Sequence, residues 1–139
     1  MVREVLNQDF NRINEIGLLI KDDFSTIYNI EDAVKKDYVH IYVYVEDEKV
    51  LGFIHIEDHF EITDIINIAV DIDYQGRGIG KKLIQYVIDN TKAEKIMLEV
   101  KANNDPAINL YNHMGFKQIH IRPKYYDGNI DAIIMERSI

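Results

Sequence analysis

The chain lacks cysteine, long apolar runs and an excess of basic residues. Without a cysteine among its 139 residues it can form no disulfide, no cysteine-ligated zinc site and no thiol nucleophile. No window approaches the length needed to cross a bilayer, so we expect a cytoplasmic protein that enters no membrane. The 24 acidic residues outnumber the 16 lysines and arginines, and the pI near 5.0 argues against nucleic-acid binding, which favours a broad basic face.

The remaining composition suits one compact domain over residues 1–139. Hydrophobic residues make up 47% of the chain, enough for a core, and the length leaves no room for a second domain. The five histidines are scattered, and His55 and His59 stand four apart on an expected strand, where they do not make the helical ligand pair of a zinc site. We therefore expect no metal.

Hydrophobic periodicity predicts the elements of the first half of the chain. Residues 61–72 are apolar on both faces, which is typical of a central strand. Before them we expect a strand over 2–6, a helix over 10–20, a short helix over 30–36, and a β-hairpin of residues 40–46 and 49–58.

The second half predicts a strand–helix–strand crossover followed by a helix and two strands. Its elements are a helix over 79–90, a strand over 95–100, a helix over 107–114 capped by Asp105 with Pro106 first and Gly115 after its end, and antiparallel strands over 116–122 and 130–136. The crossover implies one parallel strand pair of right-handed connection. The expected fold is α/β, a mixed and mostly antiparallel sheet with one parallel β-α-β crossover and helices on both faces.

A glycine-rich turn separates the central strand from the helix that follows. Glycines allow the backbone to approach an anion without interference from a Cβ atom, and the helix start adds its positive dipole end. Basic residues crowd into this turn although the chain as a whole carries a formal net charge of -8. The glycines are Gly76, Gly78 and Gly80, and the basic residues are Arg77, Lys81 and Lys82. The turn predicts a polyanionic ligand, although simple tight packing is the alternative.

Two common phosphate motifs do not fit this turn. A Walker loop needs glycine where Gln75 stands and Ser or Thr where Lys82 stands, and a dinucleotide fingerprint needs a third glycine where Lys81 stands. What remains is Gln-x-x-Gly-x-Gly, formed by Gln75, Gly78 and Gly80.

Four segments together resemble the GCN5-related N-acetyltransferase superfamily. They are the Gln-x-x-Gly-x-Gly turn, the preceding NIAV at 67–70, LEVKANNDPAINLYNHMGF at 98–116, and RPKYY with the later DAIIME. Within that superfamily the chain is most similar to the ribosomal-protein alanine N-acetyltransferases, over about residues 65–136. The resemblance departs at 22–33, where DDFSTIYNIEDA replaces a Pro-Trp-Ser-like segment of a loop that helps to shape the family's acceptor pocket.

The resemblance implies acetyl-coenzyme A (acetyl-CoA) as co-substrate and a role for each matching residue. Main-chain groups of Ile68 and Val70 would pair with the pantetheine arm, and Asn104 would touch it. Glu99 corresponds to the general base, and Tyr111 would lie near the thioester sulfur. The full set implied for the carrier is Ile68, Ala69, Val70, Gln75, Gly76, Arg77, Gly78, Ile79, Gly80, Lys81 and Asn104.

The chemistry of acetyl transfer suits these residue types. A carboxyl with an ordinary pKa of about 4.3 is a weak base toward an ammonium, so we expect Glu99 to work through a water. A phenol with a pKa of about 10 keeps its proton at pH 7 and can donate it to a leaving thiolate, which suits Tyr111. An α-amine with a pKa near 8 costs about 1.4 kcal/mol to deprotonate at pH 7, against about 4.6 kcal/mol for a lysine. We therefore expect a protein N-terminus as acceptor, and the resemblance suggests the terminal alanine of a ribosomal protein. Tyr125 and Tyr126 of the last loop would form walls for the peptide.

Other interpretations of the same residues stay open. The acceptor could instead be a small amine or a lysine, or the chain could be a non-catalytic acyl-CoA-binding module. Glu99 could be a strand-end carboxylate and Tyr111 a half-buried core aromatic. Asn104 could merely begin a helix, while Tyr125 and Tyr126 could be rim packing.

Overall fold

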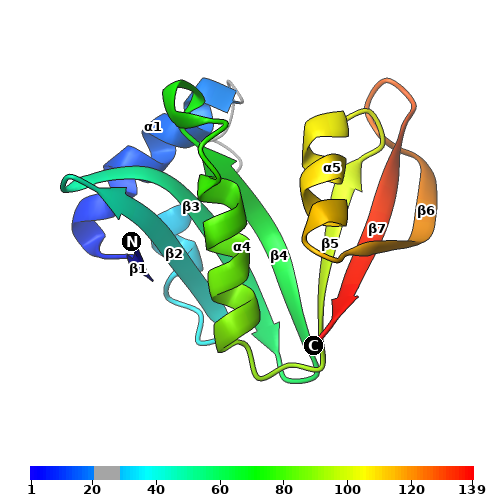
Figure 1. The fold of residues 1–139 in the computed structure, drawn as a ribbon, viewed down its shortest axis with the longest axis horizontal. Helices are drawn as coiled ribbons and strands as arrows, with labels where there is room; N and C mark the ends of the chain where they lie inside the picture. The colour runs from blue at the N-terminus through cyan, green and yellow to red at the C-terminus, as the bar shows by residue number, and fades with distance from the viewer. Residues whose placement is uncertain (21–28) are drawn as a thin grey trace.

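The computed structural model describes residues 1–20 and 29–139, which form a seven-stranded sheet and the helices packed on it (Figure 1). The strand order is β1-β2-β3-β4-β5-β7-β6. Strands β4 and β5 pair in parallel, and every other neighbouring pair is antiparallel. The strands are β1 (Val2–Glu4), β2 (Val39–Glu46), β3 (Lys49–His59), β4 (Ile62–Val70), β5 (Lys95–Lys101), β6 (Lys117–Tyr126) and β7 (Ile130–Ser138). The predicted mixed sheet with one parallel pair is confirmed.

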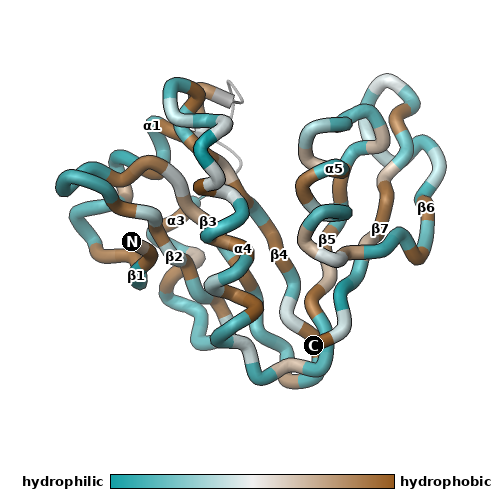
Figure 2. Tube along the Cα trace, in the orientation of Figure 1, coloured by the Kyte–Doolittle hydropathy of each residue, from teal (hydrophilic) through white to brown (hydrophobic). Residues whose placement is uncertain are grey.

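Helices cover both faces of this sheet. One hydrophobic cluster, which includes Ile54, Ile84 and Leu98, joins α4 and α5 to one face of the sheet. A second cluster, which includes Ile13 and Phe53, joins α1 and α3 to the other face. Figure 2 shows the apolar positions following the strands and the helix faces turned toward them. The helices are α1 (Phe10–Ile20), α3 (Ile30–Ala33), α4 (Ile79–Asn90) and α5 (Asp105–His113), with short 3-10 turns η1 (Asn7–Asp9) and η2 (Ile72–Tyr74). In the described part of the chain, no helix is both long and apolar enough to span a membrane.

Several predicted boundaries were wrong by a few residues. The first strand ends at Glu4, and the short helix ends at Ala33 instead of residue 36. Helix α5 is capped by Asn104, not Asp105, because the Asn104 side chain accepts a hydrogen bond from the Ala107 N–H. Strand β6 continues through Tyr126, so Tyr125 and Tyr126 end a strand and do not lie in the loop.

The sheet opens between its two parallel strands. Residues 62–65 of β4 pair with residues 95–98 of β5, and beyond them the strands diverge toward their carboxyl ends, as the V-shaped gap in Figure 1 shows. A β-bulge lies where the divergence begins, because His55 pairs with Asn67 and Ile56 with Ile65, which leaves Ile66 as an extra residue. A bulge bends its strand and increases its twist, so the sequence of β4 itself turns the strand away from β5.

Candidate active site

A cleft of about 940 Å³ follows the gap between β4 and β5. It brings together residues of β4, the glycine turn, α4, β5 and α5 that the sequence predicted as one site. Of the predicted carrier residues all but Arg77 line it, and Glu99, Tyr111 and Tyr126 line it as well, whereas Tyr125 does not. The loop at 22–33, where the resemblance departs, lies mostly outside the described residues.

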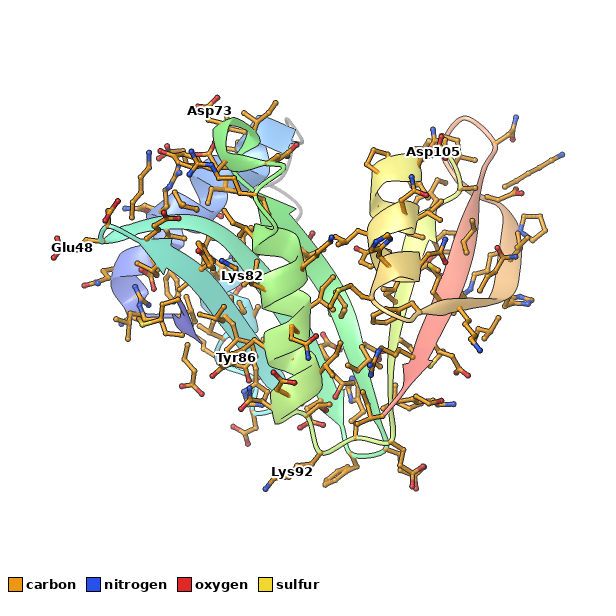
Figure 3. All side chains as sticks on the ribbon, in the orientation of Figure 1. Glu48, Asp73, Lys82, Tyr86, Lys92 and Asp105 are labelled. Atoms are coloured by element: carbon orange, nitrogen blue, oxygen red, sulfur yellow. The ribbon has the colours of Figure 1, made fainter. Side chains whose placement is uncertain are left out.

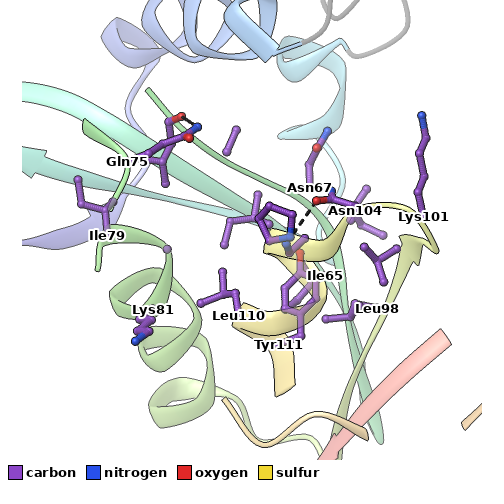
Figure 4. Close-up of a pocket in the computed structure, with 18 of the residues that line it drawn as sticks. Ile65, Asn67, Gln75, Ile79, Lys81, Leu98, Lys101, Asn104, Leu110 and Tyr111 are labelled. Carbon is purple, nitrogen blue, oxygen red and sulfur yellow. Dashed lines mark hydrogen bonds between the residues drawn. The ribbon is translucent and has the colours of Figure 1, made fainter. Parts of the chain in front are cut away.

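The edge of β4 that faces the cleft presents main-chain polar groups. The Asp71 N–H donates to the Leu51 carbonyl at 2.8 Å, and the register pairs Ala69 with Phe53, so these alternate residues direct their main-chain groups to β3. The main-chain groups of Ile68 and Val70 therefore face the gap. A ligand with an extended polar arm can pair there as an added strand does. The Gln75 side-chain amide already donates to the Val70 carbonyl at 3.2 Å, which ties the glycine turn to the end of β4 (Figure 4).

The glycine turn leaves an open, donor-lined space at the start of α4. Gly76 and Gly78 have φ angles of +82° and +79°, and a Cβ atom at either would meet nothing within 4 Å. The first intrahelical bond of this turn runs from the Lys82 N–H to the Gly78 carbonyl, so the N–H groups of residues 79–81 precede the regular ladder. Such N–H groups and the helix dipole together favour an anion.

Gly80 has a different reason to be glycine. A Cβ atom there would lie 3.3 Å from Leu110 Cδ2, so the absence of a side chain lets α4 approach α5. Both residues line the cleft.

The basic residues of the turn point in different directions. Lys81 lines the cleft. The Arg77 guanidinium lies 5.0 Å from the Tyr74 ring centre, and Lys82 Nζ lies 5.4 Å from the ring centre of Tyr44 on β2. Figure 3 shows Lys82 on the same side of α4 as Tyr86, which packs on β2 through Tyr42. Among the three basic side chains of the turn, the cleft thus receives Lys81.

A buried ion pair holds the entrance to the glycine turn. The Asp71 carboxylate accepts hydrogen bonds from the Asp73 N–H and from the Arg12 guanidinium, whose Nε donates to the Val50 carbonyl at 2.8 Å. The Asp73 N–H bond and the Arg12 charge hold the pKa of Asp71 below its ordinary value, against the opposing effect of burial. Helix α1 is thereby tied to the point where β4 ends.

Tyr111 enters the cleft from α5. Its ring packs edge-on against Phe116 at 5.8 Å between ring centres, and 6% of its surface is exposed. Burial raises the pKa of the Tyr111 phenol to about 12, so the group holds its proton at neutral pH. Figure 4 shows it beside Ile65 and Leu98, with Gln75 at the far end of the cleft. The predicted Asn104 also lines the cleft while its Oδ1 accepts from the Ala107 N–H at 3.3 Å, so it caps α5 in addition.

Glu99 reaches the gap from the other face of the sheet. Its neighbours Leu98 and Val100 point into the α5 side of the core, so the alternation of β5 turns Glu99 to the opposite side. There Arg122 Nε lies 3.3 Å from Glu99 Oε1. Burial, and after it the negative charge of Glu99, raise the pKa of Tyr126.

Sequence reasoning missed three polar residues around the gap. Asn67 and Lys101 line the cleft, and Arg122 pairs with Glu99. Asn67 could have been noticed as the polar residue in the otherwise apolar segment 65–70 of β4. Arg122 belongs to the RPKYY segment, but its contact depends on strand order, which no local pattern reveals.

Comparison with known proteins identifies the family of this fold and cleft. A sequence profile of the acetyltransferase (GNAT) family matches residues 3–116. The chain belongs to the GNAT acetyltransferase family. The predicted superfamily and the predicted N-acetyltransferase class are thereby confirmed.

Individual relatives agree with this assignment. The ribosomal protein bS18-alanine N-acetyltransferase of Haemophilus ducreyi is 33% identical in an alignment that covers 97% of each chain. The crystal structure of the ribosomal-protein-S18-alanine N-acetyltransferase from Escherichia coli has a TM-score of 0.84 at 27% identity, over 100% of this chain and 93% of that one. A putative streptothricin acetyltransferase from Bacillus anthracis, solved in complex with acetyl-CoA, has a TM-score of 0.82 over 100% of this chain and 98% of that one, and its 20% identity shows a shared fold alone.

The cleft is lined by side chains and by main-chain N–H and carbonyl groups. Across residues 1–20 and 29–139, no three His, Cys, Asp or Glu side chains gather into a set that could hold a metal ion. The arrangement offers a glycine turn with free main-chain N–H groups at one end and, in the middle, a carboxylate and a phenol on either side of an opening through the sheet.

Proposed function

We propose that this GNAT enzyme transfers the acetyl group of acetyl-CoA to the N-terminal α-amine of a protein, and that residues 1–139 form one domain for this reaction. The observation that carries the proposal is that Glu99 and Tyr111 lie on opposite sides of one opening, in the same cleft as the glycine turn proposed to bind an anion. A thioester lying in the cleft would then have a proton donor on one side and a base on the other.

The cleft fits a long carrier that ends in phosphates. The empty space beside Gly76 and Gly78 is where a side chain would obstruct a diphosphate, and the N–H groups at the start of α4 suit its charge. The main-chain groups of Ile68 and Val70 suit the amides of a pantetheine arm. Acetyl-CoA supplies the activated acetyl group, as a thioester.

Glu99 and Tyr111 have complementary roles in this proposal. Glu99 receives the proton of the acceptor amine through a water, because its carboxylate faces the side of the sheet that α5 leaves uncovered. Tyr111 donates a hydrogen bond from the buried side and, with a pKa of about 12, keeps that proton through the working pH range.

A peptide N-terminus is the acceptor that the chemistry favours. Relatives from Haemophilus ducreyi and Escherichia coli are named for the alanine N-terminus of a ribosomal protein, which makes that terminus the first acceptor to test. An α-amine costs about 3 kcal/mol less to deprotonate at pH 7 than a lysine, which suits a site with one carboxylate. Tyr126 lines the cleft and Tyr125 packs on it at 5.2 Å, so this pair offers an aromatic wall to an extended peptide.

The test is an acceptor screen read by mass spectrometry. The protein is incubated with acetyl-CoA and alanine-first peptides, serine-first peptides, N-blocked lysine peptides and polyamines. We expect the alanine-first peptides to be acetylated at the α-amine. Acetylation of lysine peptides or polyamines alone would overturn the choice of acceptor. Binding of coenzyme A with no turnover on the whole panel would indicate a non-catalytic module.

A further inference from the structure

Arg122 makes a contact that its position in the sheet does not suggest. In the strand order β5-β7-β6, the residue aligned with Arg122 across β7 is Lys101, because Ala132 pairs with both. Glu99 lies two residues earlier on β5. The Arg122 side chain therefore crosses the width of β7, roughly 10 Å between the flanking strands, to reach it.

The structure provides a path for this crossing. Ala132, the β7 residue that pairs with Arg122, is small and buried, and Arg122, Glu99 and Ile134 line one small pocket on this side of the sheet. The guanidinium lies 5.4 Å from the Tyr125 ring centre at the same time as its Nε lies 3.3 Å from Glu99 Oε1. Two contacts from different directions thus place Arg122, whose side chain is 49% exposed, beside the carboxylate of Glu99, whose side chain is 30% exposed.

A carboxylate without such a neighbour would be poorly suited to an amine acceptor. A negative charge stabilises an ammonium, which is the form that cannot attack a thioester. With the guanidinium beside it, the Glu99 carboxylate belongs to a neutral pair and attracts an ammonium less strongly, while it still accepts hydrogen bonds.

We propose that Arg122 is a positioning residue that sets the protonation state of the acceptor: paired with Glu99, it disfavours the ammonium form of an amine placed at that carboxylate. This inference rests on the proposed function, since it needs an amine delivered at Glu99.

Other charged and titratable groups of the described residues also face Glu99. They are Asp64 on β4, Lys101 on β5, His120 and Tyr126 on β6, and Glu136 on β7, which pairs with Lys95 at 3.5 Å. Arg122 is the group with a direct ion pair to Glu99, so its removal is expected to change the local charge most.

The experiment measures the turnover rate with a saturating alanine-first peptide from pH 6 to pH 9.5. In Arg122→Gln we expect the ascending limb of the profile to move to higher pH by roughly 0.5–1 unit, the shift that one charge about 5 Å away produces in partly hydrated surroundings. Arg122→Lys keeps the charge and should restore most of the profile. Lys117→Gln removes a cation from the other end of β6 and serves as the matched control.

A binding measurement separates this role from a structural one. Calorimetric titration of alanine-first peptide into the coenzyme A complex at pH 6 should show roughly 3–10-fold tighter binding to Arg122→Gln, because the unpaired carboxylate attracts the ammonium more strongly. Equal loss of rate at every pH with unchanged peptide affinity would overturn the inference.

The result also separates this inference from the proposed function. If the wild-type protein acetylates the peptide and Glu99→Gln loses rate at low pH, but Arg122→Gln keeps the wild-type profile, the inference alone is wrong. If the wild-type protein acetylates no N-terminal amine, the proposed function is wrong and the inference falls with it.

Discussion

Glu99 and Tyr111 line the same cleft from opposite faces of the sheet, Tyr111 from helix α5 and Glu99 from the face of β5 that points away from α5. The gap between β4 and β5 is what makes this possible, because a continuous sheet would separate the two side chains. Their surroundings differ as their proposed roles require. Tyr111 is buried among apolar residues, whereas Glu99 lies beside the charge of Arg122.

Tyr111→Phe should lower the turnover rate by roughly a hundredfold and change coenzyme A affinity less than about twofold. The substitution removes the hydroxyl and leaves the ring that packs on Phe116, so it tests proton donation and not packing. Steady-state kinetics and calorimetry measure the two quantities. Tyr86→Phe on α4 is the control, and a variant of Tyr111 with wild-type turnover would remove the phenol from the mechanism.

The raised pKa of Tyr111 also predicts how the turnover rate depends on pH. The pKa of the Tyr111 phenol, about 12, exceeds the ordinary thiol pKa of about 8.5 by roughly 3.5 units. Complete proton transfer from the phenol to the leaving thiolate would therefore cost about 4.8 kcal/mol. Because the folded Tyr111 stays protonated, its ionisation should cause no fall in rate up to about pH 10.

Glu99→Gln should lose rate chiefly at low pH. Below the pKa of the acceptor the amine carries a proton that a base must remove, whereas at high pH the free amine reacts without help. We expect a loss of roughly a hundredfold near pH 6.5 that shrinks several-fold by pH 9. Glu136→Gln, on the neighbouring strand, is the control. A loss that is constant across pH would indicate that Glu99 only positions the acceptor.

Gly78→Ala should weaken coenzyme A binding at least tenfold. Gly78 has a φ of +79° and caps α4, and the new Cβ would enter the open space proposed for the diphosphate. The backbone conformation alone costs an alanine about 1 kcal/mol of stability. Gly128→Ala controls for that cost, because Gly128 has a φ of +80° in the β6–β7 turn. Equal coenzyme A affinity in both variants would contradict the proposed phosphate site.

The sequence predicted the parts of the site that lie close together in the chain. The glycine turn could be predicted from its own spacing, whereas the roles of Glu99 and Tyr111 were implied by the resemblance of residues 98–116 to the superfamily. Strand order could not be found in this way, because β7 enters between β5 and β6 through pairings that connect distant residues. Arg122 depends on that order, and so its contact with Glu99 was beyond local patterns. The bulge at Ile66 was hidden for a related reason, since it is defined by the register of β4 against β3.

Charge gave a partly misleading signal at the glycine turn. Three neighbouring cations suggested one basic site, but a helix start directs successive side chains to different sides, and aromatic rings of Tyr74 and Tyr44 attract two of them. The main-chain donors of residues 79–81 therefore have a larger share in the proposed anion site than the side chains do.

Because of His55, the free energy of unfolding should decrease as the pH falls from 6.5 to 4. Burial lowers the pKa of His55 from 6.5 to about 4, so the unfolded chain binds its proton first as the pH falls. The stability from the neutral folded form is complete above pH 6.5 and is lost progressively down to pH 4, by roughly 3 kcal/mol at most. Urea unfolding across this range should show a shallower pH dependence in His55→Gln, while the exposed His113→Gln should keep the wild-type slope. An unchanged slope in His55→Gln would contradict the assignment.

Asp71→Asn should destabilise the protein at neutral pH by about 3 kcal/mol, because it leaves the Arg12 guanidinium without its buried partner. The pKa of Asp71 is lowered in the folded state, so the ion pair contributes its full stability above the unfolded pKa near 3.8 and loses it as the pH falls through the lower folded value. The difference between wild type and Asp71→Asn in urea unfolding should therefore be constant from pH 5 to pH 7 and shrink below pH 4. Asp73→Asn, two residues along and exposed, is the control.

Because Asp71 also fixes the end of β4, Asp71→Asn should weaken coenzyme A binding even where the protein is fully folded. Wild-type affinity in the folded variant would show that the glycine turn holds its shape without this anchor.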